Sequence, residues 1–421
     1  MKKYGSERWL PVLCAIFVTN VAAQSLVITN ARIIDGNGQV IDRGSVVVRD
    51  GVIESVTPGD ASATAAAERT IDANGRTVMP GFVDAHRHII TGNPDDWLTN
   101  RAAAQMQEFL AAGFTTVLSA IDPPQILQAR QRIASGAMKG PRLFAGTIIP
   151  LAAPFPDTAP TRGDPARTDP SRPPGRSTRP APAIPREATI KAVDNAANLG
   201  YDYLKTVIVT TPGGPEVDTL KLIIAEGRKH GMPTITHAVS VIDTLAALDA
   251  GPDTLVHTPH IGNLADDPAA VRRIVEARIP MTSTLAVFVP HFDDNNQPLF
   301  RDAQPFPWNT ISSAGQGPVN ARVLWQAGIE TYAYGTDTQW PPKQSLADEL
   351  RALQVVFSPR DIVQMLTRNA AKATLHGDQF GTLEPGKSAD MVILEGDPLT
   401  DVTALFNVVT TIKQGEVVFQ R

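Results

Sequence analysis

Short apolar runs rich in β-branched residues alternate along most of the chain with longer stretches whose apolar positions recur at helical spacing. Eight such runs precede helical patterns, near residues 77–84, 115–120, 142–147, 202–209, 233–237, 254–257, 280–285 and 331–337. We expect one of the intervening helices to bury Ala103, Met106 and Leu110. Repeated strand–helix units form parallel sheets covered by their crossover helices. The pattern therefore predicts an α/β fold, a (β/α)8 TIM-like barrel over residues 81–379.

The two ends of the chain share a different pattern. Residues 26–34 and 44–53 are predicted to be short strands separated by Asn-Gly and Asp-Gly turns, and residues 389–394 and 408–419 have the same character. Neither end alone offers enough strands for independent stability. We therefore expect residues 24–80 and 380–421 to form one composite β-sandwich domain beside the barrel.

The first 23 residues have the layout of a secretory signal peptide. Lys2, Lys3 and Arg8 precede an apolar run over residues 9–18, and small residues follow up to Ala23. The run is shorter than the roughly 20 apolar residues that span a bilayer, which favours cleavage over the alternative of a membrane anchor. Cys14, the single cysteine, lies in this segment. We predict an exported protein, periplasmic or secreted, whose mature chain suits an oxidising compartment.

Composition narrows the class of partner. The 421 residues are 43% hydrophobic and 19% charged, which is enough apolar content for a large core and excludes wholesale disorder. The net charge of −5 is spread without long acidic or basic runs. Such a chain lacks the electrostatic footprint of a nucleic-acid-binding or membrane-surface protein. We expect a small-molecule or short-peptide substrate.

Polar residues that could carry chemistry fall at or near the carboxyl ends of the predicted strands. In chain order they are His86, His88, Lys205, His237, His257 and Asp337. Catalytic groups of TIM barrels come from this edge. His86 and His88 should point the same way, because side chains in extended backbone repeat with a period of two. Taken singly, His237 or His257 could be a core histidine and Asp337 a helix cap, but their common position favours a shared site.

The order and context of these residues resemble the amidohydrolase superfamily, in particular its imidazolonepropionase-related and Xaa-Pro-dipeptidase-like branch. The segments that carry the resemblance are VMPGFVDAHRH (78–88), YLK (203–205), THA (236–238), VH (256–257), YGTD (334–337) and GTLEPGKSADMVIL (381–394). The resemblance extends over nearly the whole chain after its first 23 residues.

The resemblance implies a site with two divalent metal ions. It places His86, His88 and Asp337 on the more buried ion, and His237 with His257 on the other. Imidazole and carboxylate ligands at a hydrolytic site suit Zn²⁺, and they also suit Mn²⁺ or Co²⁺.

The resemblance also implies the reaction, hydrolysis of an amide or peptide C–N bond by a metal-bridged hydroxide, with Asp337 as general base and then acid. Lys205 would bridge the ions as a carboxylated lysine. Deaminases of this fold commonly lack such a bridge, so Lys205 favours amide or peptide hydrolysis. The alternative for Lys205 is an ordinary ion pair with a neighbouring acid. Alternatives for the chain are a deaminase, decarboxylase or lactonase, or a catalytically inactive structural relative.

Two long loops depart from the family pattern. The first, about 150–185, is rich in proline and contains Arg162, Arg167, Arg172, Arg176 and Arg179. Its composition indicates a flexible or polyproline-like loop, although its position after the third strand places it on the catalytic face. The second covers residues 288–313 and follows the seventh strand. His260, close behind the sixth strand, is a candidate substrate-binding residue or a structural one.

Overall fold

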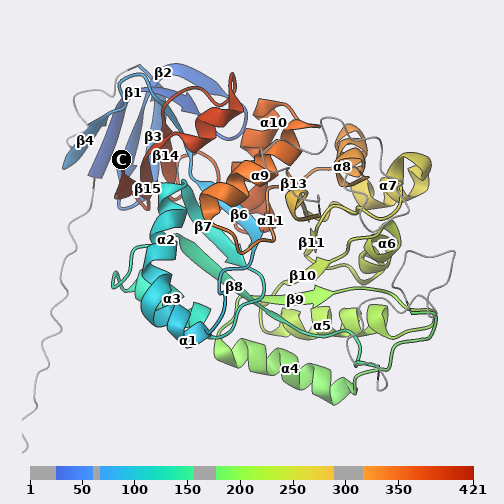
Figure 1. Cartoon of the computed structure of the whole chain (residues 1–421). Helices are drawn as coiled ribbons and strands as arrows, with labels where there is room; N and C mark the ends of the chain where they lie inside the picture. The colour runs from blue at the N-terminus through green and yellow to red at the C-terminus, as the bar shows by residue number, and fades with distance from the viewer. Residues whose placement is uncertain (1–24, 60–66, 156–176, 289–315) are drawn as a thin grey trace, which may run out of the picture.

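The computed structural model describes residues 25–59, 67–155, 177–288 and 316–421. Its centre is a parallel eight-stranded sheet whose strands follow one another in chain order around a barrel (Figure 1). The strands are β6 (Phe82–Arg87), β7 (Phe114–Ser119), β8 (Arg142–Ile148), β9 (Tyr203–Val207), β10 (Thr234–His237), β11 (Thr254–Val256), β12 (Met281–Thr282) and β13 (Tyr332–Ala333).

The barrel closes between its first and last strands through backbone hydrogen bonds. The Ala85 N–H donates to the Tyr334 carbonyl at 3.2 Å, and the Asp337 N–H donates to the His86 carbonyl at 2.8 Å. Both bonds join β6 to the segment that follows β13, where candidate site residues lie. The predicted α/β barrel is thus confirmed.

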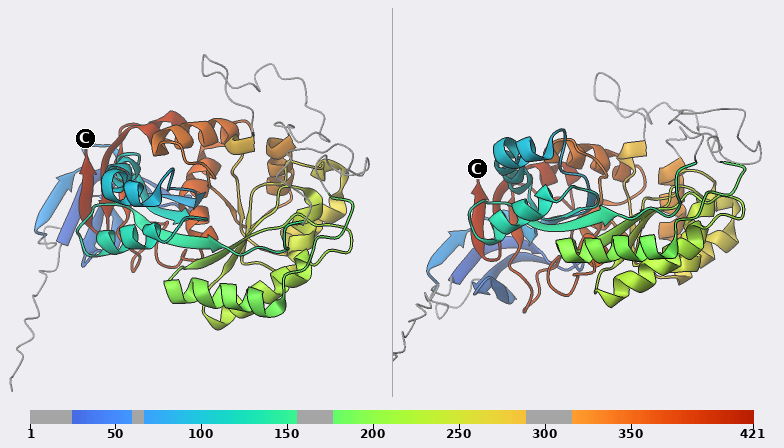
Figure 2. Two further views of the ribbon diagram at one scale, coloured as in Figure 1. Left: turned by 60° about the horizontal axis from the view of Figure 1, so that its bottom comes forward. Right: turned by 90° about the horizontal axis from the view of Figure 1, so that it is seen from below.

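Helices cover the outside of the barrel (Figure 2). They are α1 (Pro94–Asp96), η1 (Trp97–Arg101), α2 (Ala102–Ala111), α3 (Gln125–Ala134), α4 (Arg186–Leu199), α5 (Glu216–Lys229), α6 (Val241–Ala250), α7 (Pro268–Glu276), α8 (Gln316–Gln326), α9 (Pro342–Gln354), α10 (Pro359–Gln364), η6 (Met365–Asn369) and α11 (Ala370–Ala373). Local sequence sets their ends: the Ser240 side chain caps the start of α6, and Gly251 ends it in the left-handed conformation.

The buried face of α2 differs from the predicted one in a single position. Met106 and Leu110 are buried, as expected, but Ala103 is exposed. Ala102 and Phe109 complete the buried face instead. The prediction for Ala103 was wrong because α2 begins with three consecutive alanines, residues 102–104, and the apolar spacing did not determine which of them faces the core.

The second sheet is mixed and is built from both ends of the chain, as predicted. Its order is β16-β15-β14-β5-β1-β2-β3, with β4 paired to β1. Figure 1 shows the blue amino-terminal strands beside the red carboxy-terminal ones. The strands are β1 (Ser25–Ile34), β2 (Val40–Arg49), β3 (Val52–Pro58), β4 (Arg69–Asp72), β5 (Thr77–Pro80), β14 (Met391–Leu394), β15 (Val408–Lys413) and β16 (Glu416–Gln420). Ile28, Val78 and Met391 are among the residues of its separate hydrophobic core.

The run at residues 77–84, expected to be a single barrel strand, is two strands in different sheets. β5 ends at Pro80 in the composite sheet, and β6 begins at Phe82 in the barrel. Between them, the Gly81 N–H donates to the Asp390 carbonyl at 2.9 Å. A Cβ at Gly81 would lie 2.3 Å from Thr115 Oγ1, so only glycine allows this close passage between the sheets. Apolar periodicity alone does not reveal such a break.

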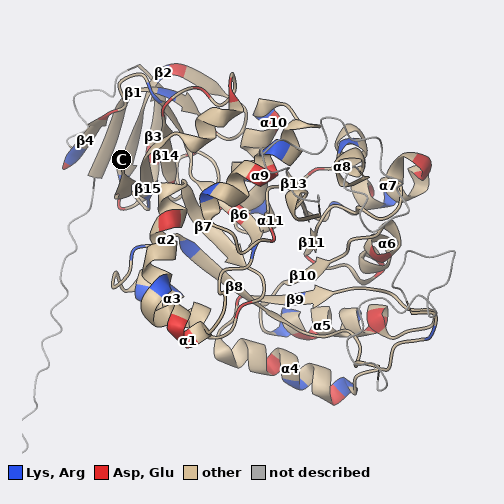
Figure 3. Cartoon of the chain, in the orientation of Figure 1, with Lys and Arg blue, Asp and Glu red and all other residues tan. Residues whose placement is uncertain are grey.

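Basic and acidic residues are mixed along the outer helices, α4 and α7 among them (Figure 3). Among the described residues, none of the helices combines the length and the apolar character needed to cross a membrane. The predicted signal peptide, residues 1–23, lies outside the described residues.

Candidate active site

The barrel brings the predicted ligands together at the carboxyl ends of its strands. They are His86 in β6, His88 directly after it, Lys205 in β9, His237 at the end of β10, His257 directly after β11, and Asp337 four residues beyond β13. Strands far apart in the sequence therefore contribute to one place.

Asp337 lies between His86 and His88. Its Oδ1 is 3.1 Å from His86 Nε2 and 2.8 Å from His88 Nε2. One ligand atom from each of the three residues lies within 4.8 Å of the other two. Burial acts to raise the pKa of Asp337, but the nearby imidazoles outweigh it and hold that pKa below its ordinary value. These three residues form a candidate metal site with an ionised carboxylate.

Lys205 is buried beside this site, and its Nζ lies 3.2 Å from His86 Nε2. Burial lowers the pKa of Lys205 to about 7, against the opposing charge of Asp337. Within the described part of the chain, no carboxylate forms an ion pair with Lys205. This geometry differs from the ordinary ion pair that was the alternative for this residue.

His257 connects this group to His237. The two rings are 4.3 Å apart, centre to centre, and His257 Nε2 lies 3.8 Å from Asp337 Oδ2. On the other side of the ring, His257 Nδ1 is 2.7 Å from Thr284 Oγ1. If Nδ1 carries the proton and donates to Thr284, the buried Nε2, which has no hydrogen-bond partner, presents a lone pair toward Asp337.

These residues fit divalent metal ions. Burial, followed by the charge of Lys205, lowers the pKa of both His86 and His237 to about 3, so the imidazoles are neutral at neutral pH. Neutral imidazole is the form that binds metal. The partnerless Nε2 of His257 is a buried polar atom that an ion would satisfy.

The backbone is strained where it enters the site. Thr284, whose hydroxyl contacts His257, has a φ of 44°, in the left-handed region that is unfavourable for a β-branched residue. His257 and Asp337 have φ angles of 80° and 53°, which are less unusual for His and Asp. Strain of this kind persists only when the surroundings enforce it, and it is concentrated at functional sites.

Several supporting residues were not anticipated. Asp84 accepts hydrogen bonds from the backbone N–H groups of His86 and Thr336, both at 3.2 Å. Asp122 accepts hydrogen bonds from Ile89 and Ile90, just beyond the second histidine. An acid within an apolar strand, two residues before His86, was a readable signal for Asp84. Asp122 had no comparable signal.

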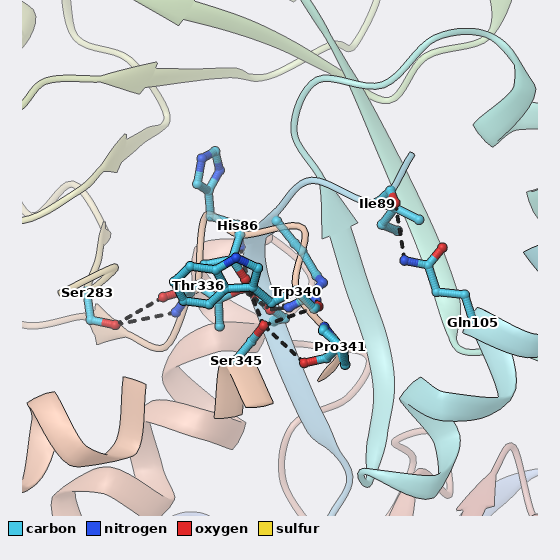
Figure 4. A network of polar contacts seen from close by, with 12 residues as sticks. His86, Ile89, Gln105, Ser283, Thr336, Trp340, Pro341 and Ser345 are labelled. Atoms are coloured by element: carbon cyan, nitrogen blue, oxygen red, sulfur yellow. Dashed lines mark hydrogen bonds and ion pairs between the residues drawn. The ribbon is translucent and has the colours of Figure 1, made fainter. Parts of the chain in front are cut away.

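The polar contacts around the β6–β13 junction are shown in Figure 4. The Ser283 hydroxyl lies 3.4 Å from both the nitrogen and the carbonyl oxygen of Gly335. The Ser345 hydroxyl lies 3.3 Å from the carbonyl oxygens of Trp340 and Pro341. The segment that carries Asp337 is therefore held on both sides.

His260 is buried and stacks on Phe288, with ring centres 3.8 Å apart. Burial lowers the pKa of His260 to about 4. Its role in substrate binding stays a prediction.

The two stems of the Pro/Arg-rich loop meet beyond the end of β8, where the Ala153 N–H donates to the Pro182 carbonyl at 2.9 Å. Residues 156–176 of this loop and residues 289–315 of the second loop lie outside the described residues.

A cavity of about 580 Å³ lies at the opposite end of the barrel. Its lining includes Tyr203, Pro233 and Asp253, at or just before the starts of β9, β10 and β11, and it contains none of the candidate ligands. The candidate chemistry is therefore separate from this cavity.

Fold and site together define a barrel enzyme with candidate metal ligands gathered at the carboxyl ends of its strands. The chain belongs to the amidohydrolase family, whose pattern it matches over residues 77–418. This confirms the resemblance drawn from the sequence.

Individual relatives are distant. An imidazolonepropionase from Shouchella clausii (strain KSM-K16) is 23% identical, covering 90% of this chain and 86% of that protein. A 5-methylthioadenosine/S-adenosylhomocysteine deaminase from Symbiobacterium thermophilum is 25% identical, covering 94% of each. A crystal structure of a Xaa-Pro dipeptidase with bound methionine superposes with a TM-score of 0.74 and 22% identity, covering 94% of this chain and all of that one. Each of these similarities covers at least 90% of this chain.

Proposed function

We propose that this protein is a metal-dependent hydrolase that cleaves an amide or peptide C–N bond of a small molecule or short peptide. The observation that carries the proposal is the convergence of His86, His88 and Asp337 around one point, with the Lys205 amine 3.2 Å from His86. Membership of the amidohydrolase family supports the reaction class.

The ligands fall into two groups. His86, His88 and Asp337 would hold the first divalent ion, most simply Zn²⁺, and His237 with His257 would hold the second. When bound, the two ions supply Lewis acidity that activates water and polarises the scissile carbonyl.

The chain's own residues would complete the chemistry. Asp337 has a carboxylate that is ionised, so it can accept a proton from water and deliver it to the departing nitrogen. Amide nitrogen leaves readily only when protonated, so this transfer is needed. Lys205, with a pKa near 7, has an accessible neutral amine that can attack CO₂, lose a proton and become a carbamate with two ligand oxygens.

A deaminase with a single metal is a second candidate. The described residues contain one tight three-ligand cluster, of His86, His88 and Asp337. The similarity to the deaminase from Symbiobacterium thermophilum also supports this second candidate.

Metal analysis combined with product analysis tests these proposals. Purified protein should contain close to two divalent ions per chain, and chelation should remove an activity that Zn²⁺, Mn²⁺ or Co²⁺ restores. The substrate panel should include N-acyl amino acids, Xaa-Pro and other dipeptides, cyclic imides and aryl amides. Release of an amine or amino acid supports amide hydrolysis, whereas free ammonia from aminated heterocycles with one bound ion supports the deaminase. Activity that is indifferent to metal would refute both.

Export is part of the proposal. The apolar segment after Lys2 and Lys3, with small residues up to Ala23, supports a cleaved signal peptide and a periplasmic or secreted enzyme. Amino-terminal sequencing of the protein recovered from cell fractions tests it. A cytoplasmic protein that retains its first 23 residues would exclude export.

A further inference from the structure

We propose that Glu349 is a positioning residue, which fixes the orientation of the His257 ring by holding the turn that contacts it. The inference rests on the proposed metal site, to which it adds a role for a residue on the outer helix α9. Three links connect the two residues: the carboxylate to the turn, the turn to Thr284, and Thr284 to the ring.

The first link is a two-pronged hydrogen bond. The Leu285 N–H donates to Glu349 Oε1 at 2.9 Å, and the Ala286 N–H donates to Oε2 at 2.8 Å. Glu349 is fully buried, and within the described part of the chain it has no Lys or Arg within ion-pair distance. A buried carboxylate without a cation is costly for folding, and here backbone N–H groups provide its compensation.

The second link is the shape of the turn. Thr284, directly before the two clamped N–H groups, adopts a φ of 44°, which is unfavourable for a β-branched residue. Its N–H donates to the Gly335 carbonyl at 3.1 Å. The turn is therefore held from two sides, by Glu349 and by the segment before Asp337, and this overrides the local preference of Thr284.

The third link is contact with the ring itself. Thr284 Oγ1 lies 2.7 Å from His257 Nδ1. Phe288, at the end of the short helix η4 (Ala286–Phe288), meets the same ring edge to face at 5.0 Å between centres. Residues on both sides of the clamped pair thus touch His257. A partner on Nδ1 fixes both the tautomer of an imidazole and the direction of its Nε2 lone pair.

Burial of Glu349 disfavours the ionised form of its carboxyl group. It raises the pKa of this carboxyl to about 7, although hydrogen bonds from Ser283, Ala286 and Leu285 act to lower it. An apolar side chain of the same size would avoid the free-energy cost of burying a carboxylate, but it could not accept hydrogen bonds from the N–H groups of Leu285 and Ala286. The contacts to the turn therefore account for an acid at this place in α9.

Glu349→Gln tests the proposal, with Asp348→Asn as the matched control. Asp348 is a buried acid on the same helix that pairs with Arg351, one helical turn away. The first readout is the ¹⁵N spectrum of the His257 ring in metal-free protein, assigned with His257→Asn. Glu349→Gln should change the Nδ1/Nε2 tautomer pattern of this ring, and Asp348→Asn should leave it as in the wild type.

The second readout is metal affinity, titrated with Zn²⁺ alone. Glu349→Gln should weaken the second ion by about 10–100-fold, the usual effect of losing a partner that orients a ligand, and leave the first within about threefold. kcat should fall with little change in KM. A Glu349→Gln protein that folds with a wild-type ring spectrum and affinity would overturn the proposal.

Glu349→Asp carries the same test if the glutamine variant does not fold, because it keeps the charge but is too short to reach both N–H groups. The ring readout needs no metal. A wild-type protein that binds no Zn²⁺ would therefore refute the proposed function, while the ring spectra would still decide the role of Glu349.

Discussion

The Asp84 carboxylate accepts two hydrogen bonds from Thr336, one from the backbone N–H at 3.2 Å and one from the hydroxyl at 2.7 Å. Asp84 lies in the first barrel strand, and Thr336 directly precedes Asp337 beyond the last. Arg87 lies beside both, with Nη1 3.1 Å from the Thr336 hydroxyl and 3.5 Å from Asp84. One buried acid thus joins the first and last strands of the barrel beside the candidate ligands His86 and Asp337.

We expect Asp84→Ala to lower the free energy of unfolding by about 3–5 kcal/mol, because it leaves the buried Arg87 without its carboxylate. Urea unfolding of the metal-free protein measures this change. Asp42→Ala is the control, since it removes the exposed partner of Arg32 and should cost at most about 1 kcal/mol. Equal losses of unfolding free energy in the two variants would show that Asp84 does not hold the first and last strands of the barrel together.

Gly335→Ala should disturb the site through crowding. An added Cβ would lie 3.1 Å from His86 Cβ and 3.2 Å from Thr282 Cβ. Those neighbours must move, so we expect a stability loss of about 1–3 kcal/mol and weaker Zn²⁺ binding at His86. Thermal unfolding and Zn²⁺ titration measure the two effects. Gly317→Ala in α8 is the control, because its Cβ would make only ordinary contacts, 3.4 Å from Leu285 Cδ2 and 3.6 Å from His260 Cβ. Unchanged Zn²⁺ affinity in Gly335→Ala would contradict the expected displacement.

The sequence predicted the barrel, the composite sheet and the polar residues that gather at the strand ends, because their signals are local. Strand–helix alternation has a clear period, and His86 and His88 show their common direction by spacing alone. The domain boundary after residue 80 was predicted, but the division of the run at 77–84 into two strands was missed, because the close passage at Gly81 depends on Thr115, which approaches only in the folded barrel.

Supporting residues were harder to predict for the same reason. Glu349 belongs to a polar helix, and its sequence context does not distinguish it from Asp348, which pairs with Arg351 on the same helix. Its contacts with Leu285 and Ala286 join residues more than 60 positions apart. Long-range hydrogen bonds to backbone N–H groups leave no pattern in the chain.

The metal-free protein should lose stability in acid. Burial lowers the pKa of His86 and His237 to about 3, and that of His260 to about 4, from an ordinary 6.5. Between these values the unfolded chain binds protons that the folded one does not, so stability falls as pH drops below about 6.5. Four acids oppose this trend, because burial raises their pKa values and the folded state keeps their protons to higher pH. They are Asp84, Asp122, Asp202 and Glu349.

The histidines should prevail, because each group within its window contributes about 1.4 kcal/mol per pH unit. Five histidines have lowered pKa values, since burial acts on His257 and His376 as well, against the four acids with raised ones. Urea unfolding of chelator-treated protein at pH 7, 6 and 5 measures the slope. His237→Asn removes one of these groups and should flatten it. Stability that rises toward pH 5 would contradict the predicted protonation states.

Lys205 offers the most chemically specific prediction. A free ammonium repels metal ions, and a neutral amine has one lone pair, so neither can bridge two cations. Burial lowers the pKa of Lys205 to about 7, which makes the neutral amine available to react with CO₂. The resulting carbamate would supply one oxygen to each ion. Lys205→Ala should therefore abolish most activity, and Lys205→Arg should do no better, because guanidinium cannot form a carbamate.

Two measurements decide whether the Lys205 carbamate exists. Enzyme loaded with Zn²⁺ in ¹³C-labelled bicarbonate should show a carbamate carbon signal that is absent from Lys205→Ala. Acetate or propionate should restore part of the activity of the alanine variant, because a short carboxylate can occupy the vacated space beside His86, where the Lys205 Nζ lies 3.2 Å from the ring nitrogen. Lys205→Arg leaves no such space and should not respond to these acids, which makes it the control. A metal-loaded enzyme with an unmodified Lys205 amine directed away from the ions would refute the bridging role and favour a site with one metal.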